Sequence, residues 1–201
     1  MRGPGAALAV LAGGVLAFFF GWWALGLVRE TLHFGCSWGI GGEWGQEGIW
    51  VCADGIGYLG VAVVLGGMSA LLAVAGVLVG VARPSLARAV VFLVLAAISI
   101  GWIGWWTYYA ATSYSGPRPA NEAGWGLWVA AVLPSIILCM IGLLVGGLGA
   151  LTSRRWSTAA LWCGVALIII GTMVQIGIGI ATFLTAGMLA AAGIGRRPPE
   201  R

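Results

Sequence analysis

Two cysteines in one polar stretch of the chain, Cys36 and Cys52, have the spacing of a disulfide that closes a small loop. A bridge across a loop of about 15 residues contributes roughly 3 kcal/mol of stability on chain-entropy grounds. A redox-active pair is the alternative, but such pairs more often take the form C-x-x-C with a lowered thiol pKa. We therefore predict a structural Cys36–Cys52 disulfide and assign no catalytic role to these sulfurs.

A histidine and several acids in the same stretch raise the question of a metal site. These residues are His33, Glu30, Glu43, Glu47 and Asp54. Zinc and non-haem iron sites usually take two or more histidine or cysteine ligands at defined spacing, whereas this stretch has one histidine beside scattered acids. We expect solvated loop carboxylates, with no bound metal and no cofactor.

Tryptophan is unusually abundant, with 12 residues in the chain. Rings at the ends of apolar segments fit an interfacial aromatic belt, where an amphipathic ring suits the headgroup layer of a membrane. The belt explains the rings of the polar stretch less well. We hypothesise that the disulfide holds these rings against the ends of two apolar segments, so that together they form one outward-facing aromatic cavity. The members of this candidate binding face are Trp38, Trp44, Trp50, Trp105, Tyr109 and Trp128.

The elements that position these residues follow from composition. Hydrophobic residues make up 61% of the 201 residues and charged residues 8%, whereas an average soluble domain is about 25% charged. So few charges cannot cover a water-soluble core, and lipid must cover the apolar surface. The chain is expected to be an all-α, polytopic transmembrane helix bundle that forms a single membrane domain over 1–201.

Apolar runs of about 20 residues or more are long enough to cross a bilayer as helices. Five such runs predict five spans, and none of them contains an Asp, Glu, Lys, Arg or His residue. Proton relays and most ion-coupled transporters keep ionisable groups within the membrane, so the usual parts of a pump are missing. The five spans are 6–28, 56–82, 89–111, 124–151 and 158–192, and the longer loops between them are 29–55 and 112–123.

The last apolar run, which extends to about Gly195, is too long for one simple crossing. Either one long or tilted helix occupies it, or two short spans turn near Gln175 to Gly179, which gives six spans. A turn within the hydrocarbon would leave backbone polar groups without partners, so we favour one helix. The terminal Arg196 and Arg197 favour the six-span alternative, because an even number of spans places them in the cytoplasm.

Arginine clusters set the expected orientation. All ten basic residues are arginines, and a cytoplasmic N-terminus places the short arginine-bearing turns inside, in agreement with the positive-inside rule. The loop 29–55 then lies on the extracytoplasmic side of the cell (plasma) membrane. The arginines that decide this are Arg2, Arg83, Arg88, Arg154 and Arg155.

Two features within the spans predict helix packing. Glycines recur four residues apart at Gly76 and Gly80 and at Gly142 and Gly146, which lets helices approach closely, either within the chain or between subunits. Gln175 is the one strong hydrogen-bonding side chain deep in a span, and we expect it to join two helices.

Two classes of function fit these observations. The first is a structural or accessory subunit of a membrane protein complex, with protein partners in the bilayer. The alternative is a binder or carrier of a lipid, a quinone or another apolar small molecule through the aromatic cavity. An enzyme is less favoured, because no nucleophile–base pair or carboxylate pair is evident, and no nucleic-acid partner is expected.

Overall fold

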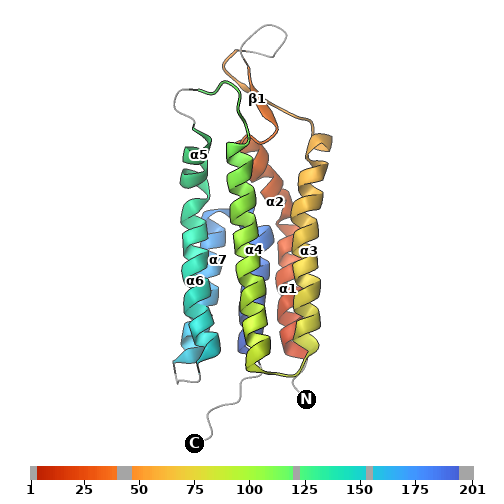
Figure 1. Ribbon diagram of the computed structural model, residues 1–201, viewed down its shortest axis with the longest axis vertical. Coiled ribbons are helices and arrows are strands. Elements are labelled where there is room, and N and C mark those ends of the chain that lie inside the picture. Colours follow the sequence, from red (N-terminus) through yellow and green to blue (C-terminus); the bar gives the residue numbers. More distant parts are fainter. Residues whose placement is uncertain (1–3, 40–46, 120–122, 153–155, 195–201) are drawn as a thin grey trace, which may run out of the picture.

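The computed structural model describes residues 4–39, 47–119, 123–152 and 156–194. They form an elongated bundle of helices along one axis (Figure 1), with a small two-stranded sheet at one end. We call this the cap end. The opposite end, where the first helix begins and the last helix ends, is the base end.

In the described ranges, eight α-helices form the bundle, together with three short helical segments of other types. The α-helices are α1 (Pro4–Phe19), α2 (Gly21–Gly26), α3 (Leu59–Val81), α4 (Leu86–Thr112), α5 (Gly124–Ala131), α6 (Leu133–Leu151), α7 (Ser157–Val174) and α8 (Gly179–Gly193). The short segments are a π-helix at Leu27–Thr31 and 3₁₀ turns at Gly55–Tyr58 and Ile176–Ile178. The strands are β1 (Cys36–Trp38) and β2 (Trp50–Cys52).

Five helical segments in the described part of the chain are long and apolar enough to cross a membrane. A sixth crossing is obtained if the bent pair formed by 5–19 and 21–31, with an angle of 47° between its halves, counts as one span. The all-α, multi-helix architecture expected from the sequence is therefore confirmed, with helices whose length and composition suit a membrane protein. The five segments are Gly55–Val81, Leu86–Thr112, Leu133–Leu151, Ser157–Val174 and Ile176–Gly193.

The prediction of one helix over 158–192 is wrong, because α7 and α8 are two separate helices that run in opposite directions. Their turn is at Gln175, whose backbone is extended, with φ −137° and ψ 90°. The side-chain oxygen of Gln175 accepts a hydrogen bond from the Gly177 N–H at 3.2 Å, and its amide nitrogen donates one to the Ala131 oxygen at 3.1 Å. The polar groups of this turn have hydrogen-bond partners inside the protein. The free-energy penalty for unpaired backbone groups in hydrocarbon, which was the reason to expect a single helix, therefore does not arise here.

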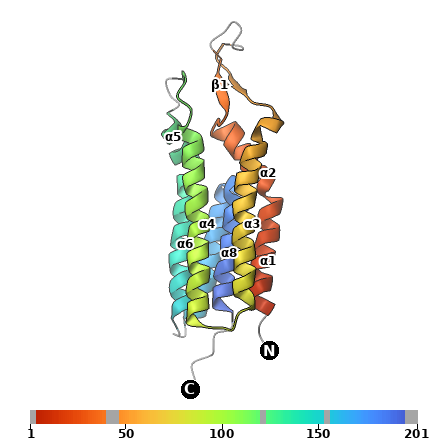
Figure 2. The same ribbon diagram turned by 45° about the vertical axis from the view of Figure 1, so that its right-hand side comes forward.

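The spans predicted over 6–28 and 124–151 are also interrupted, and their breaks lie beside the α7–α8 turn. The first breaks at Phe20, which packs against Phe183 of α8 with ring centroids 4.7 Å apart. The second breaks at Val132, just before Pro134, which can supply no backbone N–H. Three helix breaks therefore share one layer, and the turn lies short of the cap ends of α3 and α4 (Figures 1 and 2).

The core is organised around α8, which is buried along almost its whole length between α1, α3, α4, α6 and α7 (Figure 2). Its polar groups are satisfied within the bundle. Thr182 receives a hydrogen bond from Thr172 of α7 at 2.6 Å, and the backbone oxygen of Ala181 receives one from Ser99 of α4 at 3.1 Å. In a membrane such bonds help to fix helix register.

Glycine allows the closest helix contacts, and these lie within the chain. A Cβ atom at Gly142 would lie 2.7 Å from the backbone oxygen of Gly164, which joins α6 to α7. A Cβ atom at Gly13 of α1 would lie 2.7 Å from the oxygen of Phe183 in α8. At Gly76 a Cβ atom would lie 2.9 Å from Val10 of α1. The glycine pairs predicted from the sequence therefore pack helices of the same chain.

Arg88 has a structural role beyond that of a topology signal. It lies in the first turn of α4 and is only 6% exposed. Its guanidinium donates hydrogen bonds to the backbone oxygens of Ala82 at 3.0 Å and Ile194 at 2.6 Å. These oxygens follow the C-terminal ends of α3 and α8, where a positive charge is favourable. Arg88 thus ties three helices together at the base end.

Candidate functional site

The cap is the part of the protein that rises beyond the helices, and we define it as residues 32–39 and 47–54. Its strands β1 and β2 pair antiparallel, with Cys36 opposite Cys52 and Trp38 opposite Trp50. Cys36 and Cys52 form a disulfide, which confirms the prediction from the sequence. A hairpin of two three-residue strands is too short to be stable alone, so the disulfide supplies stability that the strand pairing does not provide.

Three contacts fasten the cap to the bundle. The Tyr58 hydroxyl, which precedes α3, donates a hydrogen bond to the Phe34 backbone oxygen at 2.6 Å. The Phe34 ring packs on Trp106 of α4 with centroids 5.2 Å apart. The backbone N–H of Trp38 donates a hydrogen bond to the hydroxyl of Tyr114, which lies just past α4, at 3.2 Å. The cap is therefore held on two sides, next to α3 through Tyr58 and next to α4 through Trp106 and Tyr114.

Trp50 is the centre of an aromatic cluster in the cap. The imidazole of His33 stacks on it with centroids 4.3 Å apart and an interplanar angle of 10°. Trp38 and Tyr114 meet it edge to face at 5.3 Å and 5.4 Å. His33 has a φ of 54°, in the left-handed region that residues other than glycine seldom adopt. The chain reverses at this point and brings the imidazole over the indole.

The structure distributes the predicted aromatic face over several groups. Trp38 and Trp50 belong to the cap cluster, while Trp105 and Tyr109 stack on each other at 5.9 Å and are 58% and 49% exposed. Trp128 of α5 packs on Tyr108 at 5.5 Å and donates its indole N–H to Thr107 at 3.0 Å. Phe34 connects the cap to Tyr109, at 6.3 Å. Trp44 lies outside the residues that the structure describes.

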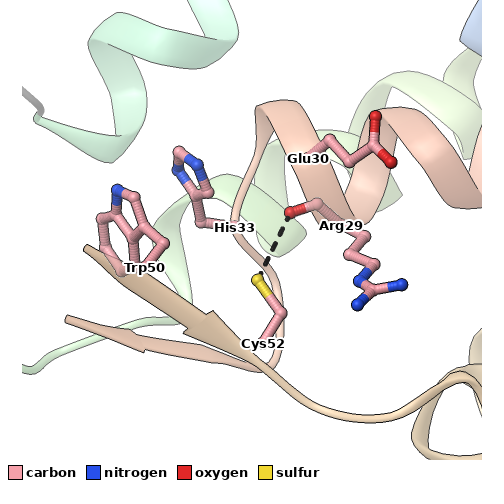
Figure 3. A pocket seen from close by; sticks show the side chains of 5 residues that line it. All are labelled: Arg29, Glu30, His33, Trp50 and Cys52. Carbon is pink, nitrogen blue, oxygen red and sulfur yellow. Dashed lines mark hydrogen bonds between the residues drawn. The ribbon is translucent and has the colours of Figure 1, made fainter. Parts of the chain in front are cut away.

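An open hollow of about 410 Å³ lies beside the cap cluster (Figure 3). The π-helix provides Arg29 and Glu30, the following turn provides His33, and β2 provides Trp50 and Cys52. Trp50 and His33 form one wall, and the Arg29 and Glu30 side chains leave the helix in different directions (Figure 3). The Cys52 sulfur lies 3.9 Å from the Arg29 backbone oxygen. Because a disulfide sulfur carries no proton, this is a van der Waals contact.

The chemistry available in the hollow is that of recognition. It offers a flat aromatic wall, one guanidinium and one carboxylate, while its sulfur is held in the disulfide. The guanidinium carbon of Arg29 also lies 5.9 Å from the centre of the Tyr58 ring, which orients the cation without neutralising it. Within the described ranges, no three His, Cys, Asp or Glu residues lie close enough to hold a metal ion.

Sequence reasoning found part of this site. It identified Cys52 and Trp50, and it considered His33 and Glu30 only as metal ligands. Arg29 received no role, although its position directly after the first apolar run places a charge at the point where the helix leaves the hydrocarbon. That position was the signal in the sequence that could have found it.

Comparison with protein-family models, with curated protein sequences and with solved structures finds no match to this chain.

Proposed function

We propose that this chain is a non-catalytic accessory subunit of the cell membrane, with its N-terminus in the cytoplasm and its cap on the extracytoplasmic side, where the cap docks a protein partner. Arg83 and Arg88, in and beside the turn between α3 and α4 at the base end, support this orientation through the positive-inside rule. A disulfide in the cap agrees with an oxidising compartment.

The single observation that carries the proposal is a disulfide-closed cap with exposed apolar side chains. Ile49 and Val51, in and beside β2, are 46% and 41% exposed. They lie in the two-stranded hairpin, beyond the helices that lipid would surround (Figure 1). Apolar surface held outside a bilayer commonly marks a site of protein contact.

Co-purification in mild detergent followed by mass spectrometry tests this function. We expect the wild-type chain to retain at least one partner protein in stoichiometric amount. The double variant Ile49→Ser with Val51→Ser should lose that partner, whereas Glu47→Gln, an exposed change in the same stretch, should keep it. Peptide mapping of the disulfide checks that the cap is intact. If the double variant keeps the same partner, or the wild type retains none, the proposal is wrong.

The hollow favours a second candidate function, which is the binding of a membrane-derived small molecule. The hollow is open on one side, and polar and apolar groups line it in similar measure. It therefore suits one small polar group of a larger molecule rather than a whole enclosed ligand. Retention of a small molecule in stoichiometric amount, without a partner protein, would favour this function over docking.

A further inference from the structure

We propose that the hollow lined by Arg29, Glu30, His33, Trp50 and Cys52 binds the headgroup of a zwitterionic phospholipid, with the phosphate at Arg29 and the ammonium group at Glu30. This assignment names the ligand class of the second candidate function, on which it rests. It does not require a protein partner. The chemical group that the hollow recognises is an amino-alcohol phosphate ester. This group is found both in the lipid phosphatidylethanolamine and in soluble phosphoethanolamines.

The charges of the hollow match those of a zwitterionic headgroup, which has a negative phosphate and a positive ammonium group. Arg29 and Glu30 are adjacent and exposed, and their side chains diverge (Figure 3). Among the described residues, no ion pair joins Glu30 to another side chain, so its carboxylate is open to a cation from outside. A guanidinium is suited to phosphate oxygens, which it can bind through two hydrogen bonds. Opposite charges side by side therefore favour a zwitterion over a simple anion, which Glu30 would repel.

The depth of the hollow is that of the headgroup layer. Leu27 and Val28 are buried in the bundle, and Arg29 and Glu30 are the first charged residues after this apolar run. A charge at this position lies where the hydrocarbon ends and the polar headgroups begin. Trp50 and His33 supply the amphipathic rings that suit the same layer.

The helix surface on the base-end side of the hollow is uncovered. Gly26, which precedes the π-helix that carries Arg29 and Glu30, has no atom within 4 Å of the position that a Cβ would occupy. An acyl chain can therefore lie against this surface, about one helical turn before Glu30. Trp22 and Trp23, one turn further along, are 80% and 54% exposed and offer apolar surface beside it. This uncovered apolar surface beside the hollow favours a lipid over a soluble phosphate ester.

Native mass spectrometry of the purified full chain tests the assignment. The delipidated protein is given equal amounts of phosphatidylethanolamine and phosphatidylglycerol with the same acyl chains. We expect the wild type to retain mainly phosphatidylethanolamine. Arg29→Gln should lower retention of both lipids by about tenfold, the value of a charged hydrogen bond. Glu30→Gln should remove the preference between them, because phosphatidylglycerol is no longer repelled and the ammonium loses its partner.

Arg83→Gln, which removes an exposed arginine at the base end, is the matched control and should leave both the amount and the preference unchanged. An excess of soluble glycerophosphoethanolamine should fail to displace the lipid, and displacement would overturn the assignment to a lipid. Equal retention of the two lipids by the wild type, or wild-type behaviour of Arg29→Gln with an intact disulfide, would overturn the site itself. A partner protein that still co-purifies in that case would leave the docking function standing.

Discussion

The side-chain amide of Gln175 donates a hydrogen bond to the backbone oxygen of Ala131, at 3.1 Å. In an unbroken helix this oxygen would accept from the N–H of Ser135, but that N–H bonds instead to Val132, at 3.1 Å, because the helix tightens at Pro134. One glutamine therefore satisfies a carbonyl left free by one helix break while it caps another. This bond explains how a turn can lie within an apolar bundle.

Replacing this glutamine should loosen the α7–α8 turn. Gln175→Leu keeps the apolar bulk and removes both hydrogen bonds, so we expect a loss of about 1–2 kcal/mol of stability. Thermal unfolding in detergent measures it. Thr152→Val is the control, because the Thr152 hydroxyl makes a solvent-accessible hydrogen bond to Leu148 of its own helix and joins no second helix. If the two variants have equal midpoints of unfolding, Gln175 does not hold the turn.

Arg88 is expected to stabilise the base end through its guanidinium. Arg88→Gln is too short to reach both Ala82 and Ile194 and removes charged hydrogen bonds to two partly buried oxygens, which should cost about 2–3 kcal/mol. Arg83→Gln removes an equal charge from an exposed site and should cost much less. The difference between the unfolding midpoints of the two variants is the measurement. A similar midpoint for both would reduce Arg88 to a topology signal.

The glycine contact between α6 and α7 gives a prediction with opposite signs at two sites. Gly142→Ala places a methyl group 2.7 Å from the Gly164 oxygen, and such overpacking typically costs about 1–3 kcal/mol. Gly67→Ala lies in α3 with nothing within 4 Å, so the better helix propensity of alanine should leave stability unchanged or raise it by up to about 1 kcal/mol. Thermal midpoints that move together would contradict the packing described for α6 and α7.

The proposed orientation is open to a labelling experiment. In a background without native cysteines, Ser85→Cys at the base end should be protected from a membrane-impermeant thiol reagent in intact cells. Ser115→Cys, near the cap, should be labelled, since both positions are exposed in the structure. Permeabilised cells provide the control, in which both are labelled. The reverse pattern in intact cells would place the cap in the cytoplasm.

The sequence was informative where a single segment carries its own signal. Apolar length predicted the helical segments that contain α3 and α4 closely, with Gly55–Val81 and Leu86–Thr112 against the expected 56–82 and 89–111. The spacing of two cysteines within one polar stretch predicted the disulfide. Each of these predictions depends on residues that are neighbours along the chain.

Features that depend on partners far apart in the chain were missed or left open. The break between α7 and α8 is tolerated because Ala131 lies beside Gln175 and accepts a hydrogen bond from its side chain. No pattern of neighbouring residues in the sequence shows this contact. The aromatic rings could be assigned to the cap end by sequence, but their division into groups depends on the path of Phe34 and Tyr114. From the sequence alone, Arg88 was interpreted as a topology signal. Its structural role could not be seen, because the backbone oxygen of Ile194 to which it donates lies 106 residues away in the chain.

Photo-crosslinking from the cap tests the central claim, that the cap docks a protein partner, most directly. A photoreactive phenylalanine analogue is introduced at Val51 in the cap or at Leu71, which is 70% exposed on the lipid-facing side of α3. After irradiation of intact cells, we predict a discrete protein adduct from position 51 and only diffuse lipid adducts from position 71. The absence of any protein adduct at 51, or the same adducts at both positions, would contradict docking through the cap.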